Sequence, residues 1–211
     1  AALRKGLSQI TITDHMPLPF ATRYAMTEDA MAQYRLDIEE AQKKYRGSLA
    51  INMGLEIEFI SECRSWIQSI TEKGWKHLIA SIHHLPGKDS LHLVNGTREE
   101  FALLLDQYKS DGRALCECYY STLQEAFSTG WFDIAGHLDV VKKHNMQGEV
   151  FDEAAPWYRT LIFEALTSIH ENGMKLEINM GGFNHPRAVQ YPSAWIVRQA
   201  VQLGIELVLS S

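Results

Sequence analysis

The stretch Ile10–His15, with the sequence ITITDH, joins a short run of apolar and β-branched residues to an aspartate and a histidine. Such a run is typical of a buried β-strand. Similar runs, each with the polar residues that end it, are Ala50–Leu55 with Glu56, Leu78–Ser81 with His83 and His84, Phe132–Ala135 with His137, and Lys175–Ile178 with Glu177 and Asn179. When parallel strands alternate with helices around a closed sheet, their carboxyl ends converge on one face. The pattern therefore predicts a cluster of metal-ligating side chains at one barrel mouth.

The segments between these strands carry helical periodicity, so the chain is predicted to be an α/β protein with a parallel sheet. Thr27 is the expected N-cap of the first long helix. Gly96 and Pro86 lie in the irregular segment Leu85–Thr97, which is predicted to be a loop over the barrel mouth. The expected helices are Thr27–Tyr45, Ile60–Lys73, Arg98–Lys109, Gly112–Thr129, Phe151–Asn172 and Pro192–Leu203. One further strand is expected at Ile205–Leu209.

Composition narrows the class of protein. A chain of 211 residues is long enough for one sizeable domain, and its formal net charge of −6 argues against a general nucleic-acid binder, which needs a basic surface. We find no apolar run long enough to span a membrane. The three cysteines are an odd number without a CxxC pair, which favours reduced thiols in a cytoplasmic protein.

The motifs together resemble the PHP (polymerase and histidinol phosphatase) superfamily, and most closely its histidinol-phosphate phosphatase branch. The similarity runs along residues 1–211, which we interpret as one domain. The motifs that carry it are Ile12–Pro19 (ITDHMPLP), Gly54–Glu58 (GLEIE), Ala80–His84 (ASIHH), Ala135–Lys143 (AGHLDVVKK), Leu176–Asn179 (LEIN) and Tyr191–Ser193 (YPS). Each motif alone is weak, but six in order at successive strand ends are specific.

The resemblance implies a distorted (βα)7 barrel that holds three divalent metals, with zinc, manganese and iron all compatible. It implies that His15, Glu56, His83 and His137 are metal ligands and form the catalytic centre. The family's His-x-His motif is expected before Ala1 and its Asp-x-His motif after Ser211. The sequence is therefore expected to be an internal portion that lacks the first strand and the C-terminal end of the barrel.

Neighbouring polar residues have several possible roles. Alternation along an extended chain sends His83 and His84 to opposite sides, so His84 is expected to line the pocket or to pack. Asp139 is expected either to hold a ligand's second ring nitrogen or to cap the following helix, and Asp14 to support the ligands from behind. Glu177 and Asn179 share one side of their strand, where they either contact substrate or pack.

Phosphate binding requires a cation beside the metals, preferably a planar guanidinium. Lys143 ends the His137 motif, and Arg187 lies in the loop at 181–189. Both are predicted to bind the phosphate, with a solvated surface position as the alternative.

The resemblance implies a metal-dependent phosphomonoesterase of histidine biosynthesis that hydrolyses L-histidinol phosphate by in-line attack of a metal-bound hydroxide. A second hypothesis is another phosphoesterase of the superfamily, such as a nucleotide phosphatase or a nuclease. A third is a non-catalytic, metal-poor barrel that serves only as a binding module. The acidic charge balance disfavours a polynucleotide substrate.

Overall fold

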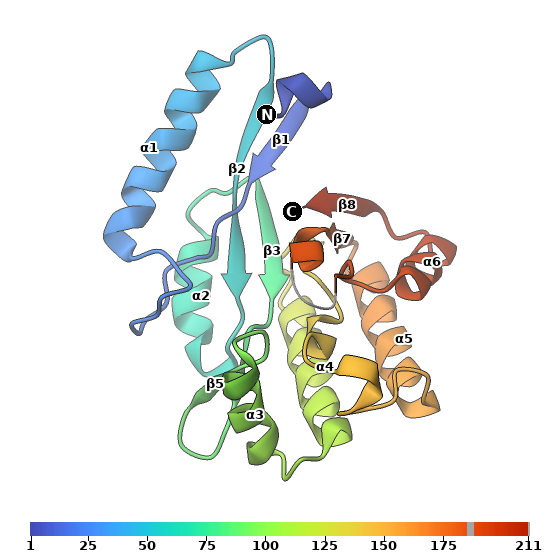
Figure 1. Cartoon of the computed structure of the whole chain (residues 1–211). Helices are drawn as coiled ribbons and strands as arrows, with labels where there is room; N and C mark the ends of the chain where they lie inside the picture. The colour runs from blue at the N-terminus through green and yellow to red at the C-terminus, as the bar shows by residue number, and fades with distance from the viewer. Residues whose placement is uncertain (185–187, 211) are drawn as a thin grey trace.

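Six parallel strands form one curled sheet in the computed structural model, which describes residues 1–184 and 188–210 (Figure 1). The strands are ordered β1-β2-β3-β6-β7-β8, so the sheet follows the chain and its edge strands are β1 and β8. Each neighbouring pair runs parallel. The prediction of an α/β fold with a parallel sheet is confirmed, and the sheet has the shape of an incomplete barrel.

The strands of the curled sheet coincide closely with the apolar runs of the sequence. They are β1 (Gln9–Ile12), β2 (Ala50–Glu58), β3 (His77–Ser81), β6 (Ile134–Ala135), β7 (Lys175–Asn179) and β8 (Leu207–Ser210). The register pairs Glu56 with Ile79 and Ile79 with Ile134, which brings the carboxyl ends of the three central strands to one level. The polar residues that follow these strands therefore start from the same edge.

Within the described residues six α-helices connect the strands, and all six were expected. They are α1 (Glu28–Lys44), α2 (Arg64–Thr71), α3 (Arg98–Gln107), α4 (Gly112–Ser128), α5 (Pro156–Glu171) and α6 (Ala194–Gln202). Helix α5 was predicted to begin at Phe151, but it begins at Pro156. Proline is favoured at the first position of a helix, because the backbone N–H that it lacks has no partner within the helix there. The buried residues of α4 and α5 form much of the core. The hydroxyl groups of Tyr120 on α4 and Tyr158 on α5 form a hydrogen bond with each other.

The segment predicted as an irregular loop contains a small antiparallel hairpin instead. Its strands are β4 (His84–Pro86) and β5 (Leu91–Leu93). Residues 87–90 join them, and the paired strands are too short to show a period in the sequence. The hairpin lies beside α3 (Figure 1).

Helix α1 is tied to the end of β1 and to the middle of β2. Thr27 caps it by accepting a hydrogen bond from the N–H of Ala30, as predicted. Further along the helix, the Tyr34 hydroxyl lies 3.0 Å from the carbonyl oxygen of Ile12 and 2.9 Å from that of Gly54, and it accepts the N–H of Asp14 at 3.3 Å. Tyr34 therefore holds the backbone that leads into His15.

Replacing Tyr34 with phenylalanine is expected to lower the free energy of unfolding by about 1–2 kcal/mol, because half-buried backbone groups lose their partner. Burial raises the pKa of Tyr34 from its ordinary value of 10.0 to about 12. Because the folded protein favours the protonated Tyr34 hydroxyl more than the unfolded chain does, this hydroxyl contributes its full stabilisation below pH 10. The contribution is lost as the pH rises from 10 to about 12. Urea unfolding at pH 8 should therefore separate wild type from Tyr34→Phe, and the difference should shrink at pH 11. Equal stabilities at pH 8 would contradict the assigned contacts.

Within the described part of the chain, no helix has the length and apolar character needed to cross a membrane.

Candidate metal centre

Four sequence-predicted residues meet where the strands end. Glu56 lies within β2, and the segment after β1 continues beside it, so that the N–H of Glu56 donates to Asp14 and the N–H of Met16 donates to Glu56. This places His15 next to Glu56. His83 follows β3 by two residues, and His137 follows β6 by two residues. The convergence that the strand order predicts is present in the structure.

The donor atoms of these residues are close enough to share ions. His137 Nε2 lies 3.0 Å from Glu56 Oε1, and His83 Nε2 lies 3.6 Å from the same oxygen. The two Nε2 atoms are 3.0 Å apart. His15 Nε2 lies 4.0 Å from the other carboxylate oxygen, Glu56 Oε2. The carboxylate is thus at the centre of the group, with imidazoles facing both of its oxygens.

This arrangement fits a metal site. Zinc binds imidazole nitrogen at about 2.0–2.1 Å, so two nitrogens on one tetrahedral ion lie roughly 3.3 Å apart. The Nε2 atoms of His83 and His137 are 3.0 Å apart, which is close to that value, and the distances from His83 and His15 to the Glu56 carboxylate, 3.6 and 4.0 Å, are of similar size. His15, Glu56 and His83 each offer a ligand atom within 4.8 Å of the others. Only small movements of the side chains are needed for these residues to hold divalent cations.

Charge within the centre is strongly coupled. Burial alone would raise the pKa of Glu56, but the hydrogen bond from His137 and the charge of that ring hold the pKa of Glu56 well below its usual range. Burial alone would lower the pKa of His137, and the contact with Glu56 instead raises it to about 9. Glu56 is therefore ionised, which is the state in which a carboxylate can bind a metal ion.

Gly136 allows the His137 segment to approach its neighbour closely. A Cβ atom at this position would lie 2.6 Å from Ser81 Oγ and 2.9 Å from the carbonyl oxygen of Ala80. Ser81 Oγ in turn donates to Glu56 Oε1 at 2.7 Å. A side chain at position 136 would therefore push β6, which leads to His137, away from β3, which carries Ser81.

Glu177 and Asn179 lie beside the centre on β7, on the same side as expected. Glu177 is buried, and its Oε2 accepts the backbone N–H of His137 at 2.8 Å. Its Oε1 accepts hydrogen bonds from Asn179 and from the Ser210 hydroxyl on β8. Burial raises the pKa of Glu177 above its ordinary value. These contacts place Glu177 as a support for the backbone of His137.

The two aspartates expected behind the ligands have different surroundings. Asp14 is exposed, and its backbone makes the contacts with Tyr34 and Glu56 described above. Asp139 is completely buried and accepts hydrogen bonds from the N–H and the hydroxyl of Ser193 at 2.9 and 2.7 Å. It also pairs with the buried ammonium of Lys142 at 2.5 Å. Asp139 occupies the N-cap position of the short turn Val140–Lys142 but makes no side-chain cap hydrogen bond there.

The predicted phosphate-binding cations are placed as follows. Lys143 is half-buried, and its ammonium group donates to the backbone carbonyl oxygens of Asn95 and Gly96, while the neighbouring His144 also contacts Gly96. Burial lowers the pKa of Lys143. The structure thus shows Lys143 fastening the segment after the hairpin to the His137 motif. Arg187 lies outside the described residues.

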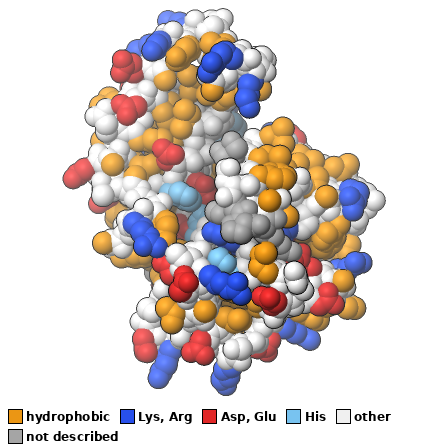
Figure 2. All heavy atoms as spheres, viewed as in Figure 1, with side chains coloured by type: hydrophobic (Ala, Val, Ile, Leu, Met, Phe, Trp, Pro, Cys, Tyr) orange, Lys and Arg blue, Asp and Glu red, His pale blue; other side chains and the backbone are white. Residues whose placement is uncertain are grey.

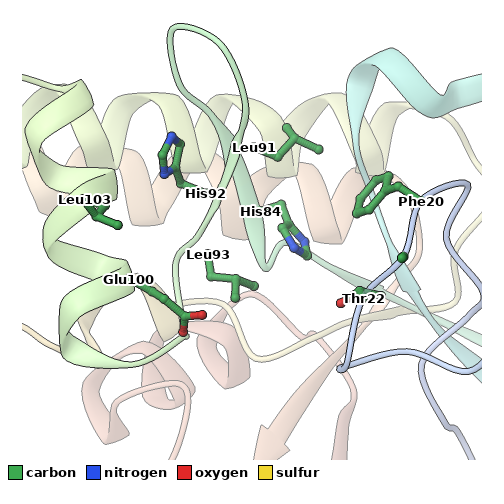
Figure 3. Close-up of a pocket in the computed structure, with 9 residues that line it drawn as sticks. Phe20, Thr22, His84, Leu91, His92, Leu93, Glu100 and Leu103 are labelled. Carbon is green, nitrogen blue, oxygen red and sulfur yellow. The ribbon is translucent and has the colours of Figure 1, made fainter.

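His84 turns away from the centre into an adjoining pocket. This open pocket of about 410 Å³ lies between the hairpin, α3 and the segment after β1 (Figure 3). The ring of His84 meets that of Phe20 edge-on, with centroids 5.9 Å apart. The pocket is also lined by Leu91, Leu93 and Glu100. Figure 2 shows histidine and acidic side chains in the hollow near the middle of this face.

One residue near the centre was missed by sequence reasoning. Glu58 is buried, and its Oε2 accepts a hydrogen bond from His83 Nδ1 at 2.7 Å. The signal that could have found it is strand alternation, because residues two apart on β2 share a face. Glu56 and Glu58 therefore both point toward the histidines that follow β3.

Comparison with known proteins gives a consistent family. The sequence profile of the PHP domain matches residues 1–181. The chain is 31% identical to a "Probable histidinol-phosphatase" of Deinococcus radiodurans, covering 100% of this chain and 76% of that protein. It is also 31% identical to the histidinol-phosphatase of Bacillus subtilis, covering 100% of this chain and 83% of the relative.

Two crystal structures share the fold. One is a candidate histidinol phosphatase of Listeria monocytogenes, with a TM-score of 0.85 at 18% identity over 100% of this chain and 85% of that one. The other is a histidinol phosphate phosphatase of Lactococcus lactis in complex with zinc, L-histidinol and phosphate, with a TM-score of 0.72 at 21% identity over 100% and 76% of the two chains. At these identities the likeness establishes the fold. Because the family profile covers most of the sequence and the barrel-like sheet agrees with it, this chain belongs to the PHP domain family.

Proposed function

We propose that the protein is a metal-dependent phosphomonoesterase that hydrolyses L-histidinol phosphate to L-histidinol and phosphate in the cytoplasm. The observation that carries the proposal is the convergence of Glu56 with three histidines in a chain that is 31% identical along its whole length to histidinol-phosphatases. Phosphate monoesters are among the slowest biological substrates to react unaided, so a strong electrostatic site is required.

The proposed ligands are His15, Glu56, His83 and His137, holding divalent metals in a cluster of up to three ions. Mixed imidazole and carboxylate donors suit zinc, manganese and iron alike. When bound, such ions polarise the phosphoryl group and lower the pKa of a coordinated water. Elemental analysis of the purified protein would identify the metals. A protein that takes up none of the three would contradict the proposal.

The chain's own residues supply the geometry. Glu177 holds the backbone of His137, and Ser81 holds one oxygen of Glu56, so the His137 backbone and the Glu56 carboxylate are held in place before substrate arrives. The reaction consumes water, breaks the bond between phosphorus and the ester oxygen, and returns a proton to the leaving alcohol. The adjoining pocket, with Phe20, His84 and Glu100, offers apolar and ionisable surfaces that suit an imidazole ring and an amine.

The test is phosphate release by the full-length, metal-loaded protein. L-histidinol phosphate should be hydrolysed with a far higher kcat/KM than AMP, an aryl phosphate or a short oligonucleotide. A preference for AMP or for the oligonucleotide would instead support a nucleotide phosphatase or a nuclease. Metal uptake without turnover of any of these substrates would support a binding module.

A further inference from the structure

Glu58 receives more hydrogen bonds from the segment after β3 than any packing role requires. Its Oε1 accepts the backbone N–H groups of His83 and His84, both at 2.8 Å. Its Oε2 accepts from the ring of His83 at 2.7 Å, and His84 Nδ1 lies 3.2 Å from Oε1. The side chain is only 5% exposed, so water does not compete for these contacts. One carboxylate therefore fixes both the backbone and the ring of His83.

The contact with the ring determines where the imidazole proton resides. An ionised carboxylate can only accept hydrogen bonds, so the ring nitrogen that faces it must carry a proton. That nitrogen is Nδ1, and a neutral ring then has a free lone pair on Nε2. This second nitrogen is the one that lies 3.6 Å from Glu56 Oε1 and 3.0 Å from His137 Nε2. A metal ligand needs that lone pair, and a hydrogen bond to the other ring nitrogen makes it a stronger donor.

We propose that Glu58 is a positioning residue that locks His83 in the Nδ1–H tautomer, so that Nε2 is held ready to bind metal. The inference rests on the proposed metal role of His83. It adds a second carboxylate to the centre: β2 supplies Glu56 to face the ions and Glu58, two residues later, to hold a histidine from behind.

Glu58→Gln provides a sharp test because glutamine has nearly the same shape as glutamate. Its amide oxygen accepts hydrogen bonds, whereas its NH2 group donates them. If the amide oxygen takes the place of Oε1, it accepts both backbone N–H groups as before. The amide NH2 group then faces His83 Nδ1 and must donate to it, which moves the ring proton to Nε2. The reverse orientation would set the NH2 group against two backbone N–H donors, leaving both buried and unpaired. The substitution is therefore expected to invert the tautomer while keeping the backbone in place.

The experiment measures the tautomer and the metal separately. In metal-free wild type labelled with 15N at histidine, two-bond proton–nitrogen spectra should show His83 protonated at Nδ1. In Glu58→Gln the pattern should switch to Nε2, and zinc affinity measured by chelator competition should fall by about 10- to 100-fold. Glu125→Gln is the matched control, since Glu125 pairs with Ser61 and Arg64 elsewhere and should leave both readouts unchanged.

Neither readout involves a substrate, so failure of the inference is distinct from failure of the proposed function. Wild-type spectra with the proton on Nε2 of His83 would overturn the inference without any variant, even if Glu58→Gln did not fold. Unchanged zinc affinity in a folded Glu58→Gln variant would overturn it as well. Loss of affinity together with the tautomer switch would support it.

Discussion

Glu56→Gln is expected to lower kcat/KM for L-histidinol phosphate by about 100- to 1000-fold, the loss typical of removing one fixed electrostatic group from an active site. The carboxylate faces His83 and His137 with one oxygen and His15 with the other. Both oxygens can serve cations. Glutamine presents one neutral oxygen and one NH2 group, and the NH2 group repels a cation.

Metal content and folding separate this effect from simple damage. The variant should bind fewer ions per chain than wild type, and added zinc should raise its melting temperature less. Circular dichroism should show an intact fold, because glutamine can still accept the hydroxyl of Ser81. Glu117→Gln, which removes only a surface pair with Arg113, is the control and should behave as wild type. Wild-type activity with full metal content in Glu56→Gln would refute the assigned role of this carboxylate.

Asp139→Ala is expected to lower the free energy of unfolding by about 3–5 kcal/mol, the cost of removing one partner from a buried ion pair. Asp139 is completely buried and Lys142 is 2% exposed, so the ammonium loses its carboxylate in a region of low dielectric. The backbone N–H of Ser193 loses its acceptor as well. This pair joins the turn after His137 to the segment that leads into α6.

A double variant distinguishes charge from packing. Asp139→Leu combined with Lys142→Met removes both charges and should recover most of the lost stability, since apolar replacement of a buried pair is often nearly neutral. Urea unfolding at neutral pH measures the free energy of unfolding of wild type, Asp139→Ala and the double variant. A loss below about 1 kcal/mol in Asp139→Ala would contradict a structural role for the pair, and no recovery in the double variant would assign the loss to shape rather than to charge.

Local patterns in the sequence were sufficient to predict the elements. β-branched and apolar runs marked the six strands, and Thr27 marked the start of α1 with the cap that the structure shows. Strand order then predicted that His15, Glu56, His83 and His137 would meet, because parallel strands deliver their ends to one edge. The hairpin of His84–Pro86 and Leu91–Leu93 escaped prediction, since three-residue strands are stabilised by pairing rather than by a local period.

The finer assignments of the site depended on contacts between segments far apart in the chain. Lys143 was expected beside phosphate, and the structure shows it bound to the carbonyl oxygens of Asn95 and Gly96. Asp139 was expected behind a histidine or at a helix start. It does precede the turn Val140–Lys142, but its carboxylate binds Lys142 and Ser193 rather than capping that turn. The residues next to Lys143 and Asp139 in the sequence do not indicate that Asn95, Gly96 and Ser193 are their partners.

The sequence by itself determined the order of strands and helices and the edge at which metal-ligating residues gather. Both depend on the period of side chains along a few neighbouring residues, which is a local property. Only the tertiary structure decided that Glu58 faces the ring of His83 and that Glu177 holds the backbone of His137, 25 and 40 residues away in the chain. Hydrogen bonds act over about 3 Å in space and have no fixed relation to distance along the chain, so such partners are set by how the strands pack.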